Sequence, residues 1–350
     1  MNITAFGINP DETIALLKDR ADQLRRGIIP SDGRKVGLVV EGGAMRGVIS
    51  CAALQGLEEL GMTGVFDEVY GASAGAVNTA YFLAGQAAYA TTIYYQKVNT
   101  TRFIRRMWHR QVVDLDELFE AIVCRERPLQ VEKVMASRSQ LFVAIADAQT
   151  GESFLGHAQS SATPLLTLLK ASSAMPLLYN GLVEVEGRRC FDGGLINPIP
   201  ILDALENGCT DLLVFLTRPE SFRECGPTGL EQRLFDMRCA RGNSQLMNAY
   251  RNTPMRSNAL RDLALGRQEV PPGINIATIC PGETDPKIER TTRNAVLLRN
   301  AAVASARRTL LTFGYPVEEI IETLRPFPAF ETALDKTEIP SESDDTLAAA

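Results

Sequence analysis

The chain has 350 residues, of which 45% are hydrophobic and 22% are charged, a composition typical of a globular protein and unlike that of a disordered or fibrous one. Its net charge of −6 argues against a nucleic-acid partner, because such proteins need many basic residues to neutralise phosphates. Most of this negative charge belongs to residues 331–350, which are rich in Glu, Asp, Ser and Thr and which we expect to be disordered. The rest of the chain is nearly neutral.

The seven cysteines are scattered and form no C-x-x-C pair; they stand at positions 51, 124, 190, 209, 225, 239 and 280. This distribution argues against a zinc cluster or a disulfide framework, so we expect no metal site. Free thiols are kept most easily in a reducing compartment. Because charged residues from Asp11 to Arg20 also interrupt any apolar stretch of signal-peptide length, we expect a cytoplasmic protein.

Residues 69–96 carry no charge and are numerous enough to span a bilayer. Glycine, serine, asparagine, glutamine and threonine residues make the segment too polar for that role. It is therefore predicted to form buried elements of a soluble core.

Apolar periodicity and glycine positions predict an α/β fold. The expected elements of the first part, in chain order, are an amphipathic helix over 10–27, a strand over 36–40, a glycine-rich loop over 41–47, a helix over 48–60, a strand over 66–70, a tight turn over 71–75 and a helix over 76–84. A strand, a glycine turn and a helix thus occur twice in succession, which is typical of a mainly parallel sheet flanked by helices.

The later part continues this pattern with less regularity. We expect strands over 141–146, 152–155, 188–191, 212–217 and 274–279, and helices over 163–172, 198–206 and 293–312. Residues 219–272 have weaker periodicity and are predicted to be helical and loop-rich. We expect four segments in the chain. Residues 1–34 form an N-terminal lead-in with the amphipathic helix, and residues 35–220 form a catalytic domain. Residues 221–330 form a helical C-terminal extension that contains one strand, and residues 331–350 form the acidic tail.

The segment Gly71-Ala-Ser-Ala-Gly75 matches the pattern G-x-S-x-G and lies between a predicted strand and a predicted helix. In such an elbow the serine sits on a sharp turn where the neighbouring residues must be small, which predicts Ser73 as a nucleophile. The alternative is a structural glycine turn whose serine takes no part in chemistry.

A serine hydroxyl needs a base before it can act as a nucleophile. The chain has two histidines, His109 and His157, and the order Ser73, Asp147, His157 leaves a catalytic triad open. A desolvated carboxylate can also serve directly as the base. The best-placed acid is Asp192, because Gly193 and Gly194 after it allow a sharp turn at a strand end; the alternative is an ordinary Asp-Gly turn.

The loop Glu41-Gly-Gly-Ala-Met-Arg-Gly47 presents backbone N–H groups at the start of a helix. A P-loop would need Lys and Ser/Thr after Gly47, and a dinucleotide fingerprint would need glycine in place of Ala44. An oxyanion hole fits better, with the N–H groups of Gly42, Gly43 and Ala44 as donors.

Together these segments resemble the patatin-like phospholipase family, and the length and C-terminal extension resemble its bacterial members. The resemblance covers roughly residues 35–220 and includes Ala171-Ser-Ser-Ala-Met-Pro176 and Asn197-Pro-Ile-Pro200 on either side of the aspartate. It implies a three-layer α/β fold, Ser73 as nucleophile, Asp192 as its dyad partner, residues 42–44 as the oxyanion hole and Arg46 at the family's basic position. The glycines that support these motifs are Gly47, Gly71, Gly75, Gly193 and Gly194.

The resemblance implies a serine acyl-hydrolase that acts on lipid esters without a metal or organic cofactor. Ala44 departs from the family pattern, which has glycine there, and a positive φ at this residue would cost energy. An acyltransferase using the same acyl-serine and a non-catalytic lipid-binding or regulatory protein are the alternatives.

Residues 97–110 hold five basic residues, no acid and the only tryptophan of the chain. As a helix they would separate an apolar face from a basic one, which could touch an anionic membrane surface transiently; the alternative is a face packed on the core with solvated arginines. We expect the walls of the substrate pocket to come from residues 85–135 and 219–272.

Overall fold

The computed structural model describes residues 9–104 and 112–316, and every structural statement below refers to these residues. The acidic tail over 331–350 and the second half of the basic segment, 105–110, lie outside them. So does His109.

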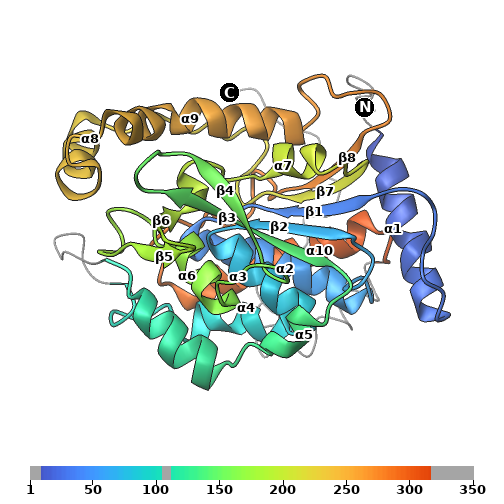
Figure 1. Ribbon diagram of the computed structural model, residues 1–350. Coiled ribbons are helices and arrows are strands. Elements are labelled where there is room, and N and C mark those ends of the chain that lie inside the picture. Colours follow the sequence, from blue (N-terminus) through green and yellow to red (C-terminus); the bar gives the residue numbers. More distant parts are fainter. Residues whose placement is uncertain (1–8, 105–111, 317–350) are drawn as a thin grey trace, which may run out of the picture.

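A central sheet of eight described strands organises the fold (Figure 1). The strands are β1 (Val36–Val40), β2 (Glu68–Ala72), β3 (Gln140–Asp147), β4 (Ser153–His157), β5 (Val183–Val185), β6 (Arg188–Asp192), β7 (Asp211–Phe215) and β8 (Asn275–Ile279). Their order is β5-β6-β3-β2-β1-β7-β8, and β4 pairs separately with β3. The pairs among β3, β2, β1, β7 and β8 are parallel, whereas β4, β5 and β6 pair antiparallel, which confirms the predicted mainly parallel sheet.

Helices cover both faces of this sheet, so the molecule has three layers. The helices are α1 (Pro10–Arg25), α2 (Gly47–Glu59), α3 (Ala74–Leu83), α4 (Ala87–Gln96), α5 (Val131–Met135), α6 (Leu165–Ser173), α7 (Ile201–Glu206), α8 (Gly229–Phe235), α9 (Ser244–Ala264) and α10 (Ala295–Thr312). Figure 1 shows α7 and α9 above the sheet and α2, α3, α4 and α10 below it, while α1 lies at one end. The predicted three-layer α/β architecture is confirmed.

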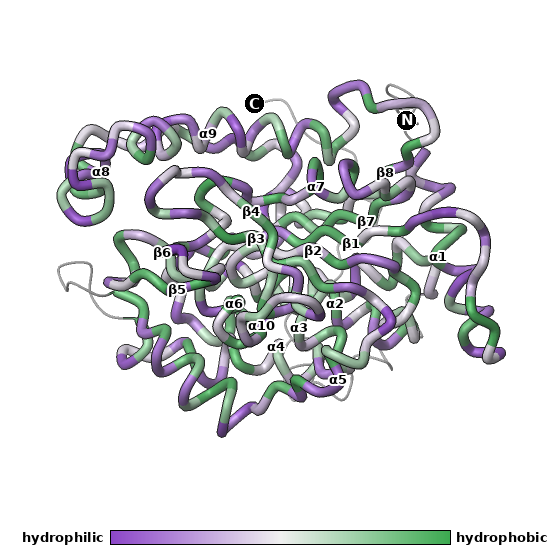
Figure 2. The backbone as a smooth tube through the Cα atoms, in the orientation of Figure 1, coloured by the Kyte–Doolittle hydropathy of each residue, from purple (hydrophilic) through white to green (hydrophobic). Residues whose placement is uncertain are grey.

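Strand β1 lies in the middle of the sheet because its sequence has no polar side. Val36, Leu38 and Val40 join the core cluster that contains side chains of α2 and α10, whereas Val39 joins the cluster that contains those of α7 and α9. All are fully buried, as a parallel strand covered on both faces requires. Figure 2 shows this pattern, with the central strands white to green and the purple stretches mainly on outer helices and loops.

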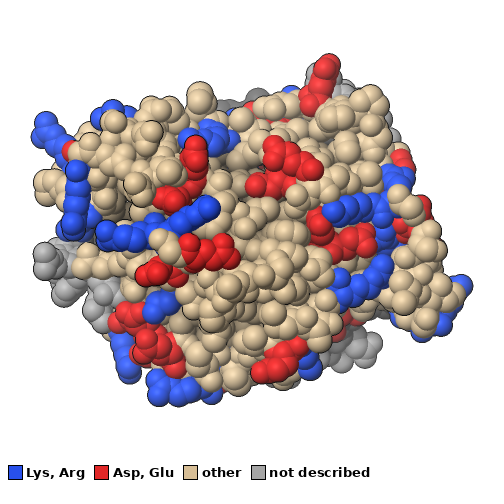
Figure 3. All heavy atoms as spheres, in the orientation of Figure 1, with Lys and Arg blue, Asp and Glu red and all other residues tan. Residues whose placement is uncertain are grey.

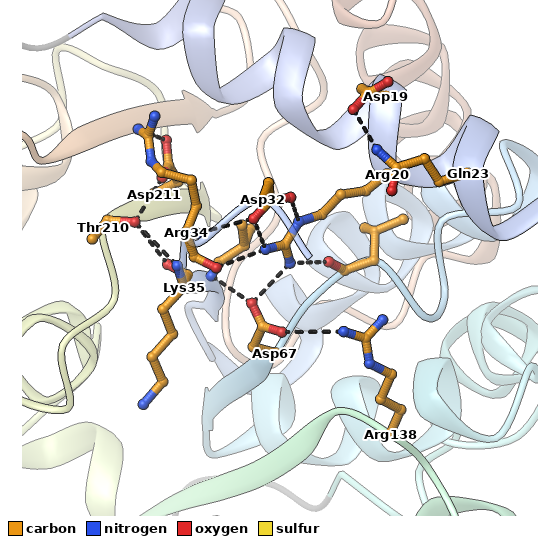
Figure 4. A network of polar contacts seen from close by, with 12 residues as sticks. Asp19, Arg20, Gln23, Asp32, Arg34, Lys35, Asp67, Arg138, Thr210 and Asp211 are labelled. Carbon is orange, nitrogen blue, oxygen red and sulfur yellow. Dashed lines mark hydrogen bonds and ion pairs between the residues drawn. The ribbon is translucent and has the colours of Figure 1, made fainter. Parts of the chain in front are cut away.

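The N-terminal helix is attached to the sheet by one buried arginine (Figure 4). Arg20, 2% exposed, donates two hydrogen bonds of 2.8 Å to the Asp32 carboxylate and one of 2.8 Å to Asp67. It also donates to the backbone carbonyls of Val65 and Arg34. Because Asp67 directly precedes β2, this network fixes α1 next to the start of that strand.

The segment predicted as a C-terminal extension completes the central sheet. Strand β8 pairs in parallel with β7, from Asp211–Asn275 to Phe215–Ile279. Helix α10 packs against α2, and Ser305 of α10 donates a hydrogen bond to the carbonyl of Ile49. Residues after 220 therefore share one core with the predicted catalytic domain. The division of the chain into two domains at residue 220 stays a prediction.

The helix predicted over residues 97–110 is wrong for its described part. Helix α4 ends at Gln96, and residues 97–104 form turns that end in an antiparallel bridge between Ile104 and Val113. The amphipathic pattern has another cause, since Phe103 and Ile104 are buried and line an internal cavity.

The uncharged run over 69–96 forms most of β2 and all of α3 and α4, which confirms its place in the core. Among the described residues, no helix has the length and apolar character needed to cross a membrane. Sequence analysis did not predict α4, α5, β5 or the π-helix over Glu117–Glu126.

Candidate active site

Ser73 occupies a strained turn between β2 and α3, as the G-x-S-x-G pattern predicts. Its backbone has φ 55° and ψ −130°, a conformation that non-glycine residues rarely adopt. The two glycines are needed because other segments approach closely. A Cβ on Gly71 would lie 2.5 Å from the Ala76 Cα, and one on Gly75 would lie 2.4 Å from the carbonyl oxygen of Val40.

Asp192 meets Ser73 although 119 residues separate them in the sequence. It is the last residue of β6, which pairs with β3, and β3 pairs with the strand that carries Ser73. The Ser73 hydroxyl donates a hydrogen bond of 2.6 Å to Asp192 Oδ2, and the backbone N–H of Gly194 donates one of 2.7 Å to Oδ1. Gly193 must be glycine, because a Cβ there would lie 2.1 Å from the Ala144 carbonyl oxygen.

The Asp192 carboxyl group is fully buried, and burial raises its pKa from the ordinary value near 4 to about 7. The hydrogen bonds from Ser73 and Gly194 and the positive charge of Arg290 act in the opposite direction, but they offset only part of the desolvation. The group therefore changes its protonation near neutral pH, where a general base works best.

The triad left open by the sequence does not form in the structure. His157 stacks on Phe142, and its ring nitrogens contact Gln140 and Ser160. Asp147 accepts hydrogen bonds from the backbone N–H groups of the turn that follows it. Neither side chain has a contact with Ser73 among those described.

The predicted oxyanion loop lies directly beside the Ser73 turn. A Cβ on Gly42 would lie 2.8 Å from the Cβ of Ser73 and 2.3 Å from the carbonyl oxygen of Ala72. Gly43 has φ 150° and Ala44 has φ 51°, so the alanine adopts the left-handed conformation that glycine would take at lower cost. Residues 42–44, Ser73 and Asp192 all line the same cavity.

Buried polar side chains that the sequence analysis did not identify hold this loop in place. The Glu41 carboxylate accepts hydrogen bonds from the backbone N–H and the hydroxyl of Thr217, and Arg261 Nη1 lies 3.5 Å from it. The Thr217 hydroxyl is also 3.0 Å from the carbonyl oxygen of Gly42. Thr217 follows β7 and Arg261 belongs to α9, so no local sequence pattern connects them to the loop.

Ser172 supports the turn around Ser73 through two hydrogen bonds. Its hydroxyl oxygen accepts a hydrogen bond of 2.9 Å from the Ser73 backbone N–H and donates one of 2.7 Å to the Ala144 carbonyl. Ser172 lies in the segment Ala171–Pro176, which is part of the sequence resemblance. The sequence assigned no role to Ser172 itself.

A mainly apolar cavity of about 130 Å³ opens beside Ser73. Ile93, Tyr94, Phe103 and Leu118 form part of its wall, and Thr253 and Ser257 of α9 contribute on another side. Both segments expected to supply the pocket walls, 85–135 and 219–272, therefore line the cavity, but α3 and residues between 173 and 198 line it as well. Among the described residues, no cluster of His, Cys, Asp or Glu is arranged to hold a metal ion.

Comparison with known proteins agrees with this geometry. Residues 38–205 match the family model described as patatin-like phospholipase. These residues are a patatin-like phospholipase domain. The domain contains most of β1, all of β2 to β6, Ser73, Asp192 and the loop over 42–44, whereas β7 and β8 follow it in the chain.

Two curated proteins are similar to parts of this chain. It is 29% identical over 198 residues to the uncharacterized protein YjjU of Escherichia coli, a match that covers 54% of each chain. It is 43% identical over 68 residues to the human patatin-like phospholipase domain-containing protein 4, covering 19% of this chain and 26% of that protein. The chain thus spans about half of the first relative and about a quarter of the second.

A solved structure, VipD from Legionella pneumophila, is similar to this chain with a TM-score of 0.43 and 12% sequence identity. The match covers 79% of this chain and 66% of VipD.

Arg46, in the glycine-rich loop over 41–47, is buried and folds back over Gly43. A Cβ on Gly43 would lie 3.0 Å from Arg46 Nε. Burial is the main cause that lowers the pKa of Arg46 to about 10, and the nearby charges of Arg290 and Arg218 add to the effect. The guanidinium therefore still carries its positive charge at neutral pH.

Proposed function

We propose that the protein is a serine acyl-hydrolase that cleaves lipid esters through a Ser73–Asp192 dyad and an acyl-serine intermediate. The observation that carries the proposal is the 2.6 Å hydrogen bond from the Ser73 hydroxyl to the buried Asp192 carboxylate. The patatin-like phospholipase domain over 38–205 supports lipid esters as the substrate class.

The first half-reaction forms the acyl-enzyme. Asp192 accepts the hydroxyl proton while the Ser73 oxygen attacks the ester carbonyl. The N–H groups of residues 42–44 stabilise the negative charge that develops on the carbonyl oxygen. When the tetrahedral intermediate collapses, the C–O bond to the alcohol breaks and the leaving alcohol takes the proton from Asp192.

The second half-reaction releases the fatty acid. A water molecule gives one proton to Asp192 and attacks the acyl carbonyl, and the resulting intermediate is stabilised by the same loop. Collapse of this intermediate returns the proton to the Ser73 oxygen and frees the carboxylic acid. No step requires a metal or an organic cofactor.

The apolar cavity supports a lipid acyl chain as the acid part of the ester. Its walls carry aliphatic and aromatic side chains from α3, α4 and the segment around Phe103. An acyl chain in this cavity would place its carbonyl carbon next to the nucleophile, which lowers the entropic cost of attack.

Two variants test the dyad with a short activated ester such as p-nitrophenyl butyrate. We expect Ser73→Ala and Asp192→Asn each to lower kcat/KM by about 10³-fold or more, because nucleophile and base act as a unit. A fluorophosphonate probe should label the wild-type protein and fail to label Ser73→Ala. Circular dichroism checks that each variant is folded.

His157→Ala is the matched control, since this side chain packs away from Ser73, and it should retain wild-type activity. Full activity of Asp192→Asn together with loss in His157→Ala would replace the dyad by a triad. No hydrolysis and no probe labelling of the folded wild type would favour a non-catalytic lipid-binding protein. Addition of an alcohol acceptor, followed by product analysis, separates hydrolysis from acyl transfer.

A further inference from the structure

A second cavity lies between strand β6 and the π-helix over Asp236–Ala240. Its volume is about 580 Å³, which is within the usual range for small-molecule sites. Phe191 of β6, Phe235 and Leu246 line it and pack together in one core cluster. Strands β5 and β6 lie at one edge of the sheet, on the same side of the molecule as α8 (Figure 1). The second cavity thus has a packed apolar floor.

Four arginines from two parts of the chain line this second cavity. Arg188 and Arg189 belong to β6, whereas Arg238 belongs to the π-helix and Arg241 directly follows it. All four are exposed. Arg188 stacks over the Phe154 ring at 4.8 Å, and within the described residues none of the four forms an ion pair. Because like charges repel one another, an anion bound among these side chains would be stabilising.

Nearby carboxylates offset only part of this positive charge. Of the described residues that line the second cavity, Asp147 alone carries a carboxylate, and it accepts hydrogen bonds from backbone N–H groups of the turn that follows it. Asp236 likewise accepts one from a backbone N–H. Glu184 lies opposite Arg189 in the β5–β6 pair, but no ion pair joins them in the described structure. A cavity lined mainly by one sign of charge concentrates ions of the opposite sign.

Backbone strain occurs at the same cavity. Five described residues other than glycine have a positive φ, namely Ala44, Ser73, Leu177, Glu186 and Arg241. The first two line the cavity beside the nucleophile. Leu177, with φ 70°, and Arg241, with φ 49°, line the second cavity. Such conformations are costly for these residue types and are concentrated at functional sites, which favours a function for the second cavity as well.

Residues 175–179 form a wall that the two cavities share. Met175 and Leu178 line the catalytic cavity, whereas Leu177 lines the second one. Tyr179 lines both. A ligand that shifts this segment in the second cavity would therefore also change the wall of the catalytic cavity.

Strand β6 contributes to both cavities in the same way. Arg189 and Phe191 line the second cavity, and Asp192, the next residue of the strand, lines the catalytic one. Neighbouring residues of a strand point to opposite sides, which explains this division. The arginine site and the catalytic aspartate are therefore carried by one element.

The arrangement of the arginines favours a ligand with more than one phosphate group. Arginine matches phosphate through parallel hydrogen bonds from its planar guanidinium. Because the four arginines come in two pairs, on β6 and around the π-helix, they suit two linked phosphates better than a single one. They also line a concave site of small-molecule volume, which favours a soluble ligand over a membrane surface or a protein.

We propose that the second cavity binds a small soluble molecule with two or more phosphate groups, and that its occupancy changes the activity at Ser73 through residues 175–179. The binding is independent of the proposed hydrolase function, whereas the effect on activity rests on it. Arg238 and Arg241 belong to this site although they lie beyond the matched domain, which ends at residue 205.

The binding test uses ADP and adenosine, which differ in the diphosphate group. In calorimetry the wild type should bind ADP and not adenosine, and pyrophosphate should compete with ADP. Arg189→Gln and Arg238→Gln, one from each pair, should each weaken ADP binding about tenfold or more, because a hydrogen-bonded charge is lost. Arg233→Gln is the control, since this exposed arginine of α8 lines neither cavity. Thermal melting curves show whether each variant is folded.

Hydrogen exchange tests the shared wall without any turnover. ADP should slow the exchange of backbone amides in peptides that cover residues 175–182 of the wild type, and it should have no such effect in Arg238→Gln. Saturating ADP should also change kcat/KM for p-nitrophenyl butyrate by about fivefold or more in the wild type, but not in Arg238→Gln. If the wild type hydrolyses no ester, binding and exchange still decide on the second site.

Several results would overturn the proposal. The site for linked phosphates is excluded if neither ADP nor pyrophosphate binds the wild type, or if inorganic phosphate binds as tightly as pyrophosphate. An equal loss of ADP affinity in Arg233→Gln and Arg238→Gln would show general charge attraction. Binding to phosphatidylcholine vesicles that contain phosphatidic acid, without binding of ADP or pyrophosphate, would assign the arginines to a lipid surface instead. ADP binding that changes neither exchange nor hydrolysis would exclude the effect on Ser73.

Discussion

Ser172 fixes the backbone of Ser73 by accepting a hydrogen bond of 2.9 Å from its N–H. The same hydroxyl donates to the carbonyl of Ala144 in β3, so one side chain joins the nucleophile turn to the neighbouring strand. Since Ser73 has a strained φ of 55°, its conformation depends on contacts of this kind.

Ser172→Ala should therefore lower both activity and stability. The substitution leaves the buried N–H of Ser73 and the carbonyl of Ala144 without this partner, which costs about 1–3 kcal/mol. We expect kcat to fall more than KM rises, because the nucleophile is misplaced. Thr312→Ala is the control, since the Thr312 hydroxyl also donates to a carbonyl of its own helix, that of Arg308, and Thr312 does not line the cavity. Equal effects of the two substitutions on kcat would contradict this role.

The activity should rise with pH through the pKa of Asp192. Burial raises this pKa to about 7, and only the ionised carboxylate can accept the Ser73 proton. We expect kcat/KM for a neutral ester to increase about tenfold per pH unit below pH 6 and to level off above pH 8. A profile that is flat from pH 5 to pH 8 would argue against Asp192 as the base.

Asp192 should also make the folded state less stable as the pH rises. Its pKa is near 4 in the unfolded chain and about 7 in the folded protein, so the folded state binds the proton more tightly. The contribution of this group is favourable below about pH 4 and is lost between about pH 4 and pH 7.

Asp192→Asn removes this ionisation, so the variant should unfold at a higher urea concentration than wild type at pH 8. We expect a gain in the free energy of unfolding on the order of 2 kcal/mol at pH 8 that shrinks steadily towards pH 5. Urea unfolding at several pH values measures it. A difference that does not depend on pH would contradict the raised pKa.

Ala44→Gly should cost no stability, unlike most alanine-to-glycine changes in structured segments. Ala44 has φ 51°, where an L-residue is less stable than glycine by about 1 kcal/mol. We expect an unchanged or higher melting temperature for this variant. Ala259→Gly, in the interior of α9, is the control and should lose about 1 kcal/mol. A comparable loss in both variants would show that the loop does not strain Ala44.

Arg20→Met should be strongly destabilising. It removes the cation that Asp32 and Asp67 share and leaves the carbonyls of Val65 and Arg34 without their partner. Breaking a buried ion pair in this way costs about 3–5 kcal/mol.

Arg25→Met, five residues further along the same helix, is the control for Arg20→Met. Arg25 is exposed and, among the described residues, forms an ion pair with Asp22 alone, so we expect a change of less than about 1 kcal/mol. Urea unfolding measures both variants. Similar midpoints would mean that the network around Arg20 does not hold α1 in place.

The charged residues on one face of the molecule give no reason to expect a field of one sign there. On the face shown in Figure 3, Lys and Arg lie interspersed with Asp and Glu. This agrees with a chain that is nearly neutral outside residues 331–350.

The features predicted well from the sequence are those encoded by local patterns. The apolar run of β1 and the tight turn around Ser73 depend on neighbouring residues, so both could be recognised directly. The elements that were missed lack such patterns. Helix α4 follows α3 within an uncharged segment and has no charged face to mark its period, while the three-residue β5 is too short to recognise.

The supports of the site could not be predicted, because they come from distant parts of the chain. Thr217 and Arg261 reach Glu41 from more than 170 positions away, and Arg290 reaches Met45 from a loop that the motifs do not include. The helix predicted over residues 97–110 is wrong in its described part, 97–104, for a related reason. Its apolar residues line a cavity, so their spacing does not report a helix.

The position of β1 between β2 and β7 has a consequence for any attempt to work with the patatin-like domain alone. A fragment that stops at residue 205 would lack β7 and β8 and would make β1 an edge strand. Its backbone N–H and C=O groups would then be open to pairing with other chains, along a sequence of Val, Gly and Leu without any charge. Such a fragment should aggregate on expression, and the aggregation should be relieved by restoring the segment through residue 279.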